Sequence, residues 1–360
     1  MHIKSESMKI AIDCRLIGQS GIGTFIENVV YHMVKHTELH FVLIGNKERL
    51  AAYTSNANCR IVECNYDSFT LKELFCFPVK EVNQCDVFFT PNFNITMGIR
   101  VPIFSTIHDV VFFDVEGICS PIGKAIRWLY MKRALAISKT VFTVSEFSKG
   151  RIESHFHPKC PVCICYSGIS QGLVEYKQQH APERKARKRQ LVFLGNLKKQ
   201  KGIGILIDAF EKVRRRGLTD MRLVIIGNMN SKTKDPAVIR FLYQKHEDID
   251  FVGNASNQQV FDILSESLAL VSPSIYEGLG LPPMEAMYLG TQAVISDIPV
   301  YKEIYGDTNA TFFRSGDADD LCEKLLSIRP QAADLSGIVE KRFNFATVSD
   351  VIINAIHLAV

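Results

Sequence analysis

Two glutamates with seven residues between them, Glu277 and Glu285, bracket a turn that reads EGLGLPPME. Gly278 and Gly280 allow a tight loop where a side chain would clash, and the two prolines that follow suit the first turn of a helix. Such a helix would direct unpaired amides and its positive dipole end at an anion such as a diphosphate. A carboxylate there would repel a diphosphate, so both glutamates are better suited to accept hydrogen bonds from sugar or ribose hydroxyls.

A basic loop follows another apolar run and reads LGNLKKQKG over residues 194–202. Lys198, Lys199 and Lys201 could neutralise negative charge that develops on a departing diphosphate. The alternative is an ordinary solvated turn, in which the three ammonium groups face water and bind nothing.

Two further groups of residues lie in the first half of the chain. Gly21 and Gly23 stand at the entry of an apolar helical pattern, where their amides could approach a phosphate. The loop is not a full GxGxxG, and no acidic residue follows at the ribose-binding distance, which argues against a nicotinamide dinucleotide. An ordinary strand–helix turn remains the alternative.

His108 and Asp109 follow the apolar run Val101–Ile107. The carboxyl end of a parallel strand is where ligands bind in open α/β sheets. A neutral histidine there can donate a hydrogen bond to a sugar hydroxyl or accept one. Asp109 could orient the ring or contact an acceptor, and a purely structural histidine is the alternative.

The composition limits the class of protein. A chain of 360 residues predicts two domains, and a net charge of +4 is too small to argue for nucleic acid. No run of 18 uncharged apolar residues predicts a membrane span, and the N-terminal stretch lacks the apolar core of a secretory signal. The ten cysteines, several inside strand-like runs, fit buried hydrophobes in a reducing cytoplasm.

Short apolar runs alternate with helical patterns, which predicts α/β domains with parallel sheets. The first series of strands is expected at Met8–Cys14, His40–Ile44, Arg60–Cys64, Asp86–Thr90, Pro102–Ile107, Thr140–Val144 and Val162–Tyr166. The second is expected at Leu191–Leu194, Arg222–Ile226, Ile249–Val252, Leu268–Ser272 and Gln292–Ser296. A charged stretch without apolar periodicity separates them. We therefore expect a domain over 1–172, a linker over 173–189, a second domain over 190–342 and a final helix over 343–360.

The stretch from Tyr276 to Glu285 resembles the Glu-x7-Glu signature of retaining GT-B glycosyltransferases, especially glycosyltransferase family 4. The segment Val144-Ser-Glu-Phe-Ser, the turn Val252-Gly-Asn and the stretch Ser296–Glu303 resemble further elements of that family. The resemblance implies two facing Rossmann-like domains with the ligand in an interdomain cleft. It also implies that the final helix crosses back onto the first domain.

The resemblance assigns roles residue by residue. The candidate catalytic residues are Glu277, His108 and Lys201; the donor-binding candidates are Gly21, Gly23, Asn196, Lys198, Val252, Gly278, Leu279, Gly280, Leu281 and Glu285; the acceptor candidate is Asp109. Many members carry an arginine where this chain has Asn196, which puts one phosphate contact in doubt. No metal and no cofactor are implied, because lysines and a helix end take the metal's place.

The implied activity is transfer of a hexosyl group, mannose or a related hexose, from a nucleotide-diphosphate sugar with retention at the anomeric carbon. Similar bacterial proteins often build surface polysaccharide such as lipopolysaccharide on glycan or lipid-linked acceptors, in the cytoplasm. The alternatives are a GT-B epimerase, a phosphorylase, or a non-catalytic nucleotide-sugar-binding partner in a glycan-assembly complex. Asn196 is the feature that favours the last of these.

Two other patterns have competing interpretations. The stretch 121–139 carries Trp128, Tyr130 and several basic residues, which would suit either a helix on the inner membrane surface or one packed on the first domain. The stretch 155–165 holds histidines and cysteines. A structural zinc site needs four ligands at one point, and no second CxxC exists, so we expect no zinc there.

Overall fold

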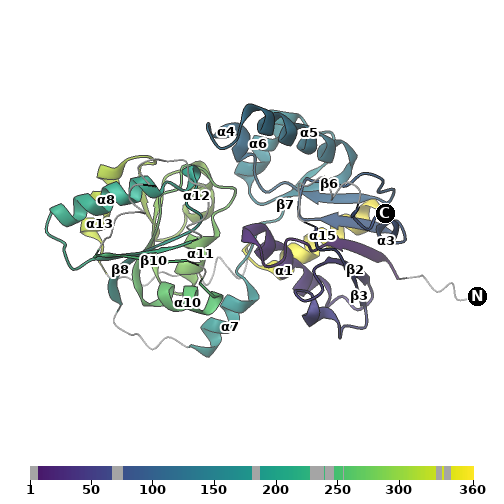
Figure 1. The fold of residues 1–360 in the computed structure, drawn as a ribbon, viewed down its shortest axis with the longest axis horizontal. Helices are drawn as coiled ribbons and strands as arrows, with labels where there is room; N and C mark the ends of the chain where they lie inside the picture. The colour runs from purple at the N-terminus through teal and green to yellow at the C-terminus, as the bar shows by residue number, and fades with distance from the viewer. Residues whose placement is uncertain are drawn as a thin grey trace, which may run out of the picture. The chain divides into compact units, whose positions relative to one another are not determined.

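The computed structural model describes residues 7–66, 76–180, 187–227, 239, 247–253, 255–329, 335 and 342–360. The chain divides into two compact units (Figure 1). Unit 1 comprises the described parts of Met1–Phe113, Cys119–Gly168 and Asn344–Val360; unit 2 comprises those of Asp114–Ile118 and Ile169–Phe343.

Unit 1 is built on a seven-stranded parallel sheet with the strand order β3-β2-β1-β4-β5-β6-β7. Its strands are β1 (Lys9–Asp13), β2 (His40–Gly45), β3 (Cys59–Glu63), β4 (Val87–Thr90), β5 (Ile103–Thr106), β6 (Ser138–Thr143) and β7 (Val162–Ile164). Its helices are α1 (Ser20–Met33), η1 (Ala51–Tyr53), α3 (Val79–Val82), α4 (Val111–Asp114), α5 (Pro121–Ile137), α6 (Glu146–Phe156) and α15 (Phe345–Ala359).

Alternation along β1 explains why both faces of this sheet are covered. Ile10 and Ile12 point into the core that α1 and α15 complete, whereas Ala11 faces the core formed with α5 and α6. The Ser349 hydroxyl of α15 donates to the Val29 carbonyl of α1 at 3.0 Å. The last helix of the chain is therefore part of unit 1.

Unit 2 has a six-stranded parallel sheet with the order β10-β9-β8-β11-β12-β13. Its strands are β8 (Lys188–Leu194), β9 (Arg222–Ile226), β10 (Ile249–Val252), β11 (Ser267–Ser272), β12 (Gln292–Ser296) and β13 (Thr311–Phe313). Its helices are α7 (Gln171–Gln179), η2 (Lys199–Lys201), α8 (Ile203–Arg215), α10 (Asn257–Glu266), α11 (Leu281–Tyr288), α12 (Pro299–Tyr305) and α13 (Ala318–Ser327). Helices α8 and α13 pack on one face of the sheet, and α10 and α11 on the other.

The expectation of two α/β domains with parallel sheets is confirmed. The twelve predicted strands all occur, and their bounds agree to within two residues except at β8, which begins three residues earlier than predicted. Strand β13 was not predicted, because three residues are too few to display a period. Helix α7 occupies the start of the stretch where we expected a linker, and residues 181–186 lie outside the described part of the chain.

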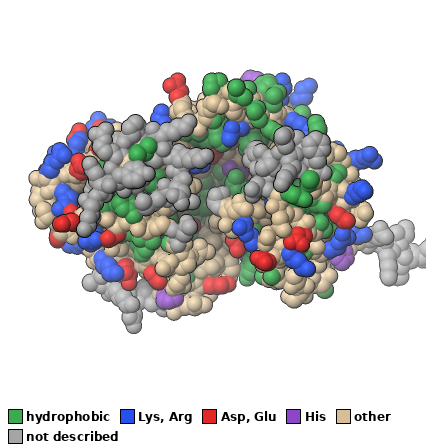
Figure 2. Space-filling view, viewed as in Figure 1, with side chains coloured by type: hydrophobic (Ala, Val, Ile, Leu, Met, Phe, Trp, Pro, Cys, Tyr) green, Lys and Arg blue, Asp and Glu red, His purple; other side chains and the backbone are tan. Residues whose placement is uncertain are grey.

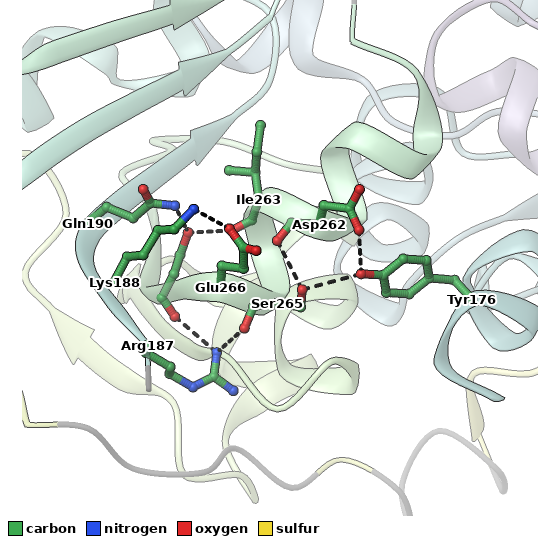
Figure 3. A network of polar contacts seen from close by, with 9 residues as sticks. Tyr176, Arg187, Lys188, Gln190, Asp262, Ile263, Ser265 and Glu266 are labelled. Carbon is green, nitrogen blue, oxygen red and sulfur yellow. Dashed lines mark hydrogen bonds and ion pairs between the residues drawn. The ribbon is translucent and has the colours of Figure 1, made fainter. Parts of the chain in front are cut away.

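A polar network fixes the start of unit 2 (Figure 3). The Tyr176 hydroxyl of α7 donates to Asp262 of α10 at 2.7 Å. Arg187, immediately before β8, donates to the carbonyls of Ser265, Ser267 and Gly290 at 3.0, 2.9 and 2.6 Å. One guanidinium group thus satisfies carbonyls at the ends of three elements, and burial lowers its pKa from the ordinary value.

Candidate functional site

The loop over residues 273–280, between β11 and α11, is shaped by two tyrosines from α12. Gly280 has a φ of +85°, and a Cβ built there would lie 2.3 Å from the ring of Tyr301, so the position excludes other residues. The Tyr301 hydroxyl is 2.6 Å from Ser272 Oγ, and the Tyr305 hydroxyl donates to the Gly280 carbonyl. Both tyrosine side chains are fully buried. A rigid support thus underlies the glycine-rich turn.

Glu277 and Lys201 are in direct contact. The Lys201 ammonium donates to both Glu277 oxygens, at 2.6 and 2.8 Å, and the Ser274 hydroxyl donates to Oε1 at 2.7 Å. The Glu277 side chain is 11% exposed and that of Lys201 is 23% exposed. The pair is therefore partly shielded from water but still reachable by a ligand.

The local backbone explains how residues 76 positions apart meet. Strands β8 and β11 are neighbours in the sheet, so the loops after them share its carboxyl edge. Gly202 has a φ of +66°, and a Cβ there would lie 1.9 Å from the Pro273 carbonyl oxygen. The Ile275 amide donates to the Gln200 carbonyl at 2.9 Å. The two loops are joined directly through their backbones.

Glu285 lies on α11, eight positions beyond Glu277. Burial raises the pKa of its carboxyl group to about 7. Within the described part of the chain, its carboxylate has no hydrogen-bond or ion-pair partner. A half-buried carboxyl group without a partner is suited to a hydroxyl-bearing ligand.

The start of α11 offers fewer amides than the sequence suggested. Pro282 and Pro283 occupy its first turn and have no N–H. An anion at this helix end would therefore rely on the Leu281 amide, the preceding loop and the helix dipole.

The three lysines of the basic loop have different surroundings. Lys201 contacts Glu277, as described, whereas the Lys199 ammonium donates to the Glu116 carbonyl at 3.0 Å. Lys198 and Asn196 are exposed. The structure thus brings one lysine of the three to the glutamate.

His108 follows β5 in unit 1. Its Nε2 lies 3.0 Å from the Pro91 carbonyl, and because a carbonyl only accepts, Nε2 carries the proton and Nδ1 is an acceptor. The ring meets Phe25 of α1 edge-on at 5.0 Å. Burial lowers its pKa to about 4, so the ring is neutral near pH 7.

Asp109 and the two glycines of the first loop have partly structural roles. Asp109 Oδ1 accepts from the Val111 amide at 3.0 Å, at the start of α4. A Cβ at Gly23 would lie 2.2 Å from the Leu16 carbonyl oxygen, so this glycine is required by packing. A Cβ at Gly21 would meet nothing within 4 Å. Of the two, Gly21 faces the more open space.

The remaining candidates can be placed briefly. Val252 ends β10, and its carbonyl accepts from the Gly227 amide at 3.1 Å; Asn254 lies outside the described residues. Ser145 caps α6 by accepting from the Ser148 amide at 3.0 Å, which is a structural role. The sequence did not identify Tyr301 and Tyr305 as supports of the site, although their four-residue spacing places both on one helical face.

The described residues contain no group of three or more histidine, cysteine, aspartate or glutamate side chains placed to hold a metal ion. No helix in the described ranges combines the length and apolar character needed to cross a bilayer.

Comparison with solved structures identifies the fold. A structure of Anabaena Alr3699/HepE in complex with UDP and glucose matches 97% of this chain and 99% of its own, with a TM-score of 0.70 at 15% identity. The two parallel-sheet units therefore have the GT-B fold of glycosyltransferases. Residues 175–333, most of unit 2, match the family model described as Glycosyl transferases group 1. The matched segment contains the Lys201–Glu277 pair and Glu285.

Curated relatives agree with this family. An uncharacterized glycosyltransferase of Methanocaldococcus jannaschii, MJ1607, is 27% identical over 214 residues, which are 57% of this chain and 54% of the relative. The O-antigen chain mannosyltransferase B of Escherichia coli is 24% identical over 233 residues, which are 61% of this chain and 59% of the relative. The alignments thus span little more than half the length of each relative.

Proposed function

We propose that the protein is a retaining family 4 glycosyltransferase that moves mannose or a related hexose from a nucleotide-diphosphate sugar to a glycan or lipid-linked acceptor. Surface polysaccharide synthesis is the proposed setting. The contact between Lys201 and Glu277 beneath the glycine-rich turn carries the proposal. The match to a mannosyltransferase supports mannose as the transferred sugar. The similar structure that was solved with UDP and glucose supports a nucleotide-sugar donor.

The proposed chemistry places the leaving diphosphate against the Lys201 ammonium and the amides that precede α11. Donors already aimed at the oxygens that gain charge lower the barrier without reorganisation. Glu277 holds hydroxyls of the transferred sugar, and Glu285 holds those of the ribose. The acceptor oxygen attacks the anomeric carbon on the face that the diphosphate leaves, and its proton passes to a phosphate oxygen. The products are the glycosylated acceptor and a nucleoside diphosphate, and in this proposal Lys201 and the helix end take the place of a metal.

In this proposal, unit 1 binds the acceptor and contributes a contact with the transferred sugar. Nδ1 of the neutral His108 ring can accept a hydrogen bond from a sugar hydroxyl. Asp109 is the acidic candidate for a contact with the acceptor substrate. Gly21 would let the backbone of the first loop approach the donor.

The experiment is a thermal-shift panel of GDP, UDP, ADP and dTDP, then of their sugars, because a ligand that binds only the folded state raises its stability. The best donor is then tested for transfer with wild type, Glu277→Ala and Lys201→Met. We expect both variants to stay folded and to lose transfer at least 100-fold. Lys212→Met is the matched control, because Lys212 pairs with Asp319 on the surface of the same unit. Full turnover in Glu277→Ala would refute the assignment.

A second candidate is a non-catalytic nucleotide-sugar binder. The exposed Asn196, at the position where many family members have arginine, favours it. Slow donor hydrolysis without acceptor would argue for catalysis, and binding without turnover across the donor panel would argue for the binder. Epimerised product without acceptor would indicate an epimerase instead.

We also propose that α5 contacts the inner face of the membrane, with the rest of the protein in the cytoplasm. Ile122, Ile126 and Leu129 recur on one face of this helix and are 74%, 47% and 61% exposed. The helix has four basic residues and no acidic one between Pro121 and Ile137. Hydrophobic and basic side chains gather together on the surface over α5 (Figure 2). This combination suits an anionic lipid surface.

Flotation with vesicles containing phosphatidylglycerol tests the membrane contact. Wild type should bind at low salt and dissociate as salt rises, because charge attraction is screened. Ile126→Asp should bind more weakly, whereas Leu358→Asp, on the exposed part of α15, should not. No flotation of wild type at low salt would remove this part of the proposal.

A further inference from the structure

A pocket in unit 1, separate from the Lys201–Glu277 pair, has a cationic lining. It has a volume of about 160 Å³ and is lined mainly by Arg15, Gln19, Asn46, Arg49, Asn65 and Tyr66. These residues follow β1, β2 and β3, three neighbouring strands, so the pocket lies at the carboxyl edge of the sheet. A single water needs roughly 10–15 Å³. The space therefore admits a group of several atoms.

Arg15 is built into the wall of this pocket. Its Nε and Nη2 donate to the two oxygens of Asp13 at 2.9 and 2.7 Å, and its guanidinium lies 4.7 Å from the centre of the Phe77 ring. The residue is 6% exposed. A bidentate partner and a stacked ring hold the guanidinium in one orientation before any ligand arrives.

Arg49 forms the opposite, exposed side. Its Nη1 donates to the Ile17 carbonyl at 2.8 Å, and its amide donates to Asn46 Oδ1 at 3.0 Å. Asn46 Nδ2 in turn donates to Asn65 at 3.0 Å. These bonds join the loops after β1, β2 and β3 into one wall.

The charged side chains in the lining are both cationic. Two guanidinium groups line the pocket, of which Arg15 is paired with Asp13, and the described lining residues include no carboxylate. Asp13 is turned toward the Arg15 guanidinium, and Glu63 accepts from Asn65 at 2.9 Å outside the lining. Guanidinium groups recognise phosphate through paired, charge-assisted hydrogen bonds. The amide and phenol groups of the lining can supply further donors.

We propose that this pocket binds a phosphoryl group carried by the acceptor. The inference rests on the proposed function, because it assigns an acceptor-side role to a pocket in unit 1. It adds the chemical class of the acceptor, which is a phosphorylated one. The carrier is either a sugar phosphate or an isoprenyl phosphate, since both present the same group.

The test measures thermal stability against inorganic phosphate at constant ionic strength. Phosphate should stabilise wild type, and Arg49→Gln should raise the apparent Kd at least tenfold. Arg49 is exposed, so this variant should fold. Arg100→Gln, at another exposed arginine of unit 1, should match wild type. No phosphate-dependent shift in wild type, or an equal shift in Arg49→Gln, overturns the proposal.

Two further arms identify the carrier and separate this proposal from the donor site. A hexose phosphate or an isoprenyl phosphate in detergent should bind more tightly than inorganic phosphate, and the tighter of the two is the carrier. Lys201→Met should lose nucleoside diphosphate binding but keep the phosphate response, whereas Arg49→Gln should do the reverse. Loss of both responses in Arg49→Gln would overturn the assignment of a separate pocket.

Discussion

Replacing Glu285 by glutamine should stabilise the protein at alkaline pH. Burial on α11 raises the pKa of this carboxyl group from 4.5 to about 7. Between these values the folded chain holds a proton that the unfolded chain has lost. The free energy of unfolding therefore falls as pH rises through this window, and the loss is complete above pH 7.

The magnitude follows from the shift. The rise of this pKa from 4.5 to about 7 corresponds to about 3 kcal/mol at this site, because a difference of one in pKa is equivalent to about 1.36 kcal/mol. Most of it, about 2–3 kcal/mol, falls between pH 5 and pH 8. Glutamine keeps the shape of the side chain and cannot ionise. Glu285→Gln should therefore exceed wild type by about 3 kcal/mol at pH 8 and by less than about 1 kcal/mol at pH 5.

Urea unfolding followed by circular dichroism at both pH values measures the difference. Hydrogen exchange of the α11 amides would show whether the gain is local to unit 2. Asp307→Asn, which removes an exposed carboxylate from the same unit, is the control. If the variant differs from wild type equally at pH 5 and pH 8, the carboxylate is well solvated and the reasoning fails. If the proposed function is correct, Glu285→Gln should also bind nucleoside diphosphates more weakly. A role in ligand binding would explain why this position has a glutamate that destabilises the folded chain at neutral pH.

Three other experiments test contacts of the site and its support. Gly280→Ala should cost about 2–4 kcal/mol of stability, from a positive φ and a clash with a buried ring, whereas Gly21→Ala should cost less than about 0.5 kcal/mol. Lys201→Met and Glu277→Gln should show a coupling energy of about 1–3 kcal/mol in a double-mutant cycle of thermal or urea unfolding. Arg187→Met should destabilise unit 2 by more than about 2 kcal/mol, because several carbonyls lose their donor.

Each of these predictions has an outcome that would contradict it. Equal losses in the two glycine variants would mean that the strain at Gly280 is absent in solution. Strict additivity of the Lys201 and Glu277 variants would mean that the two groups do not interact. Arg189→Met is the control for Arg187, because Arg189 pairs with Asp220 on the surface, where an ion pair contributes at most about 1 kcal/mol. A similar cost for both arginines would contradict the role of the network in Figure 3.

The strands could be predicted from the sequence because a buried strand appears as a continuous run of apolar residues. The run Leu268–Val271 is apolar without a break, as expected for a strand covered on both faces, and β11 is buried along its whole length. The turn after it was also predictable, because glycine and proline restrict the backbone by themselves. Gly280 has the left-handed conformation that its position required, and the prolines lie in the first helical turn.

Contacts between residues that are far apart in the sequence could not be predicted from such local patterns. Nothing near Gly280 shows that Tyr301 and Tyr305 lie beneath it, because the contact depends on the packing of α12 against the loop after β11. Likewise, local sequence alone does not show which of Lys198, Lys199 and Lys201 contacts the glutamate. Their different partners follow from the backbone bonds that join the loops after β8 and β11, which only the folded chain contains.

The Lys201–Glu277 pair sets a condition on how a nucleotide sugar could bind. The ammonium donates to both carboxylate oxygens, yet it has three protons and can donate to two acceptors on different sides. A diphosphate oxygen that takes one of these hydrogen bonds releases one oxygen of Glu277, and that oxygen can then accept from a sugar hydroxyl. Because the cation stays beside the carboxylate throughout, neither charge is left unpaired during the exchange, which would otherwise cost several kcal/mol in a partly buried site. Binding of the diphosphate and of the sugar would therefore be coupled through one ion pair.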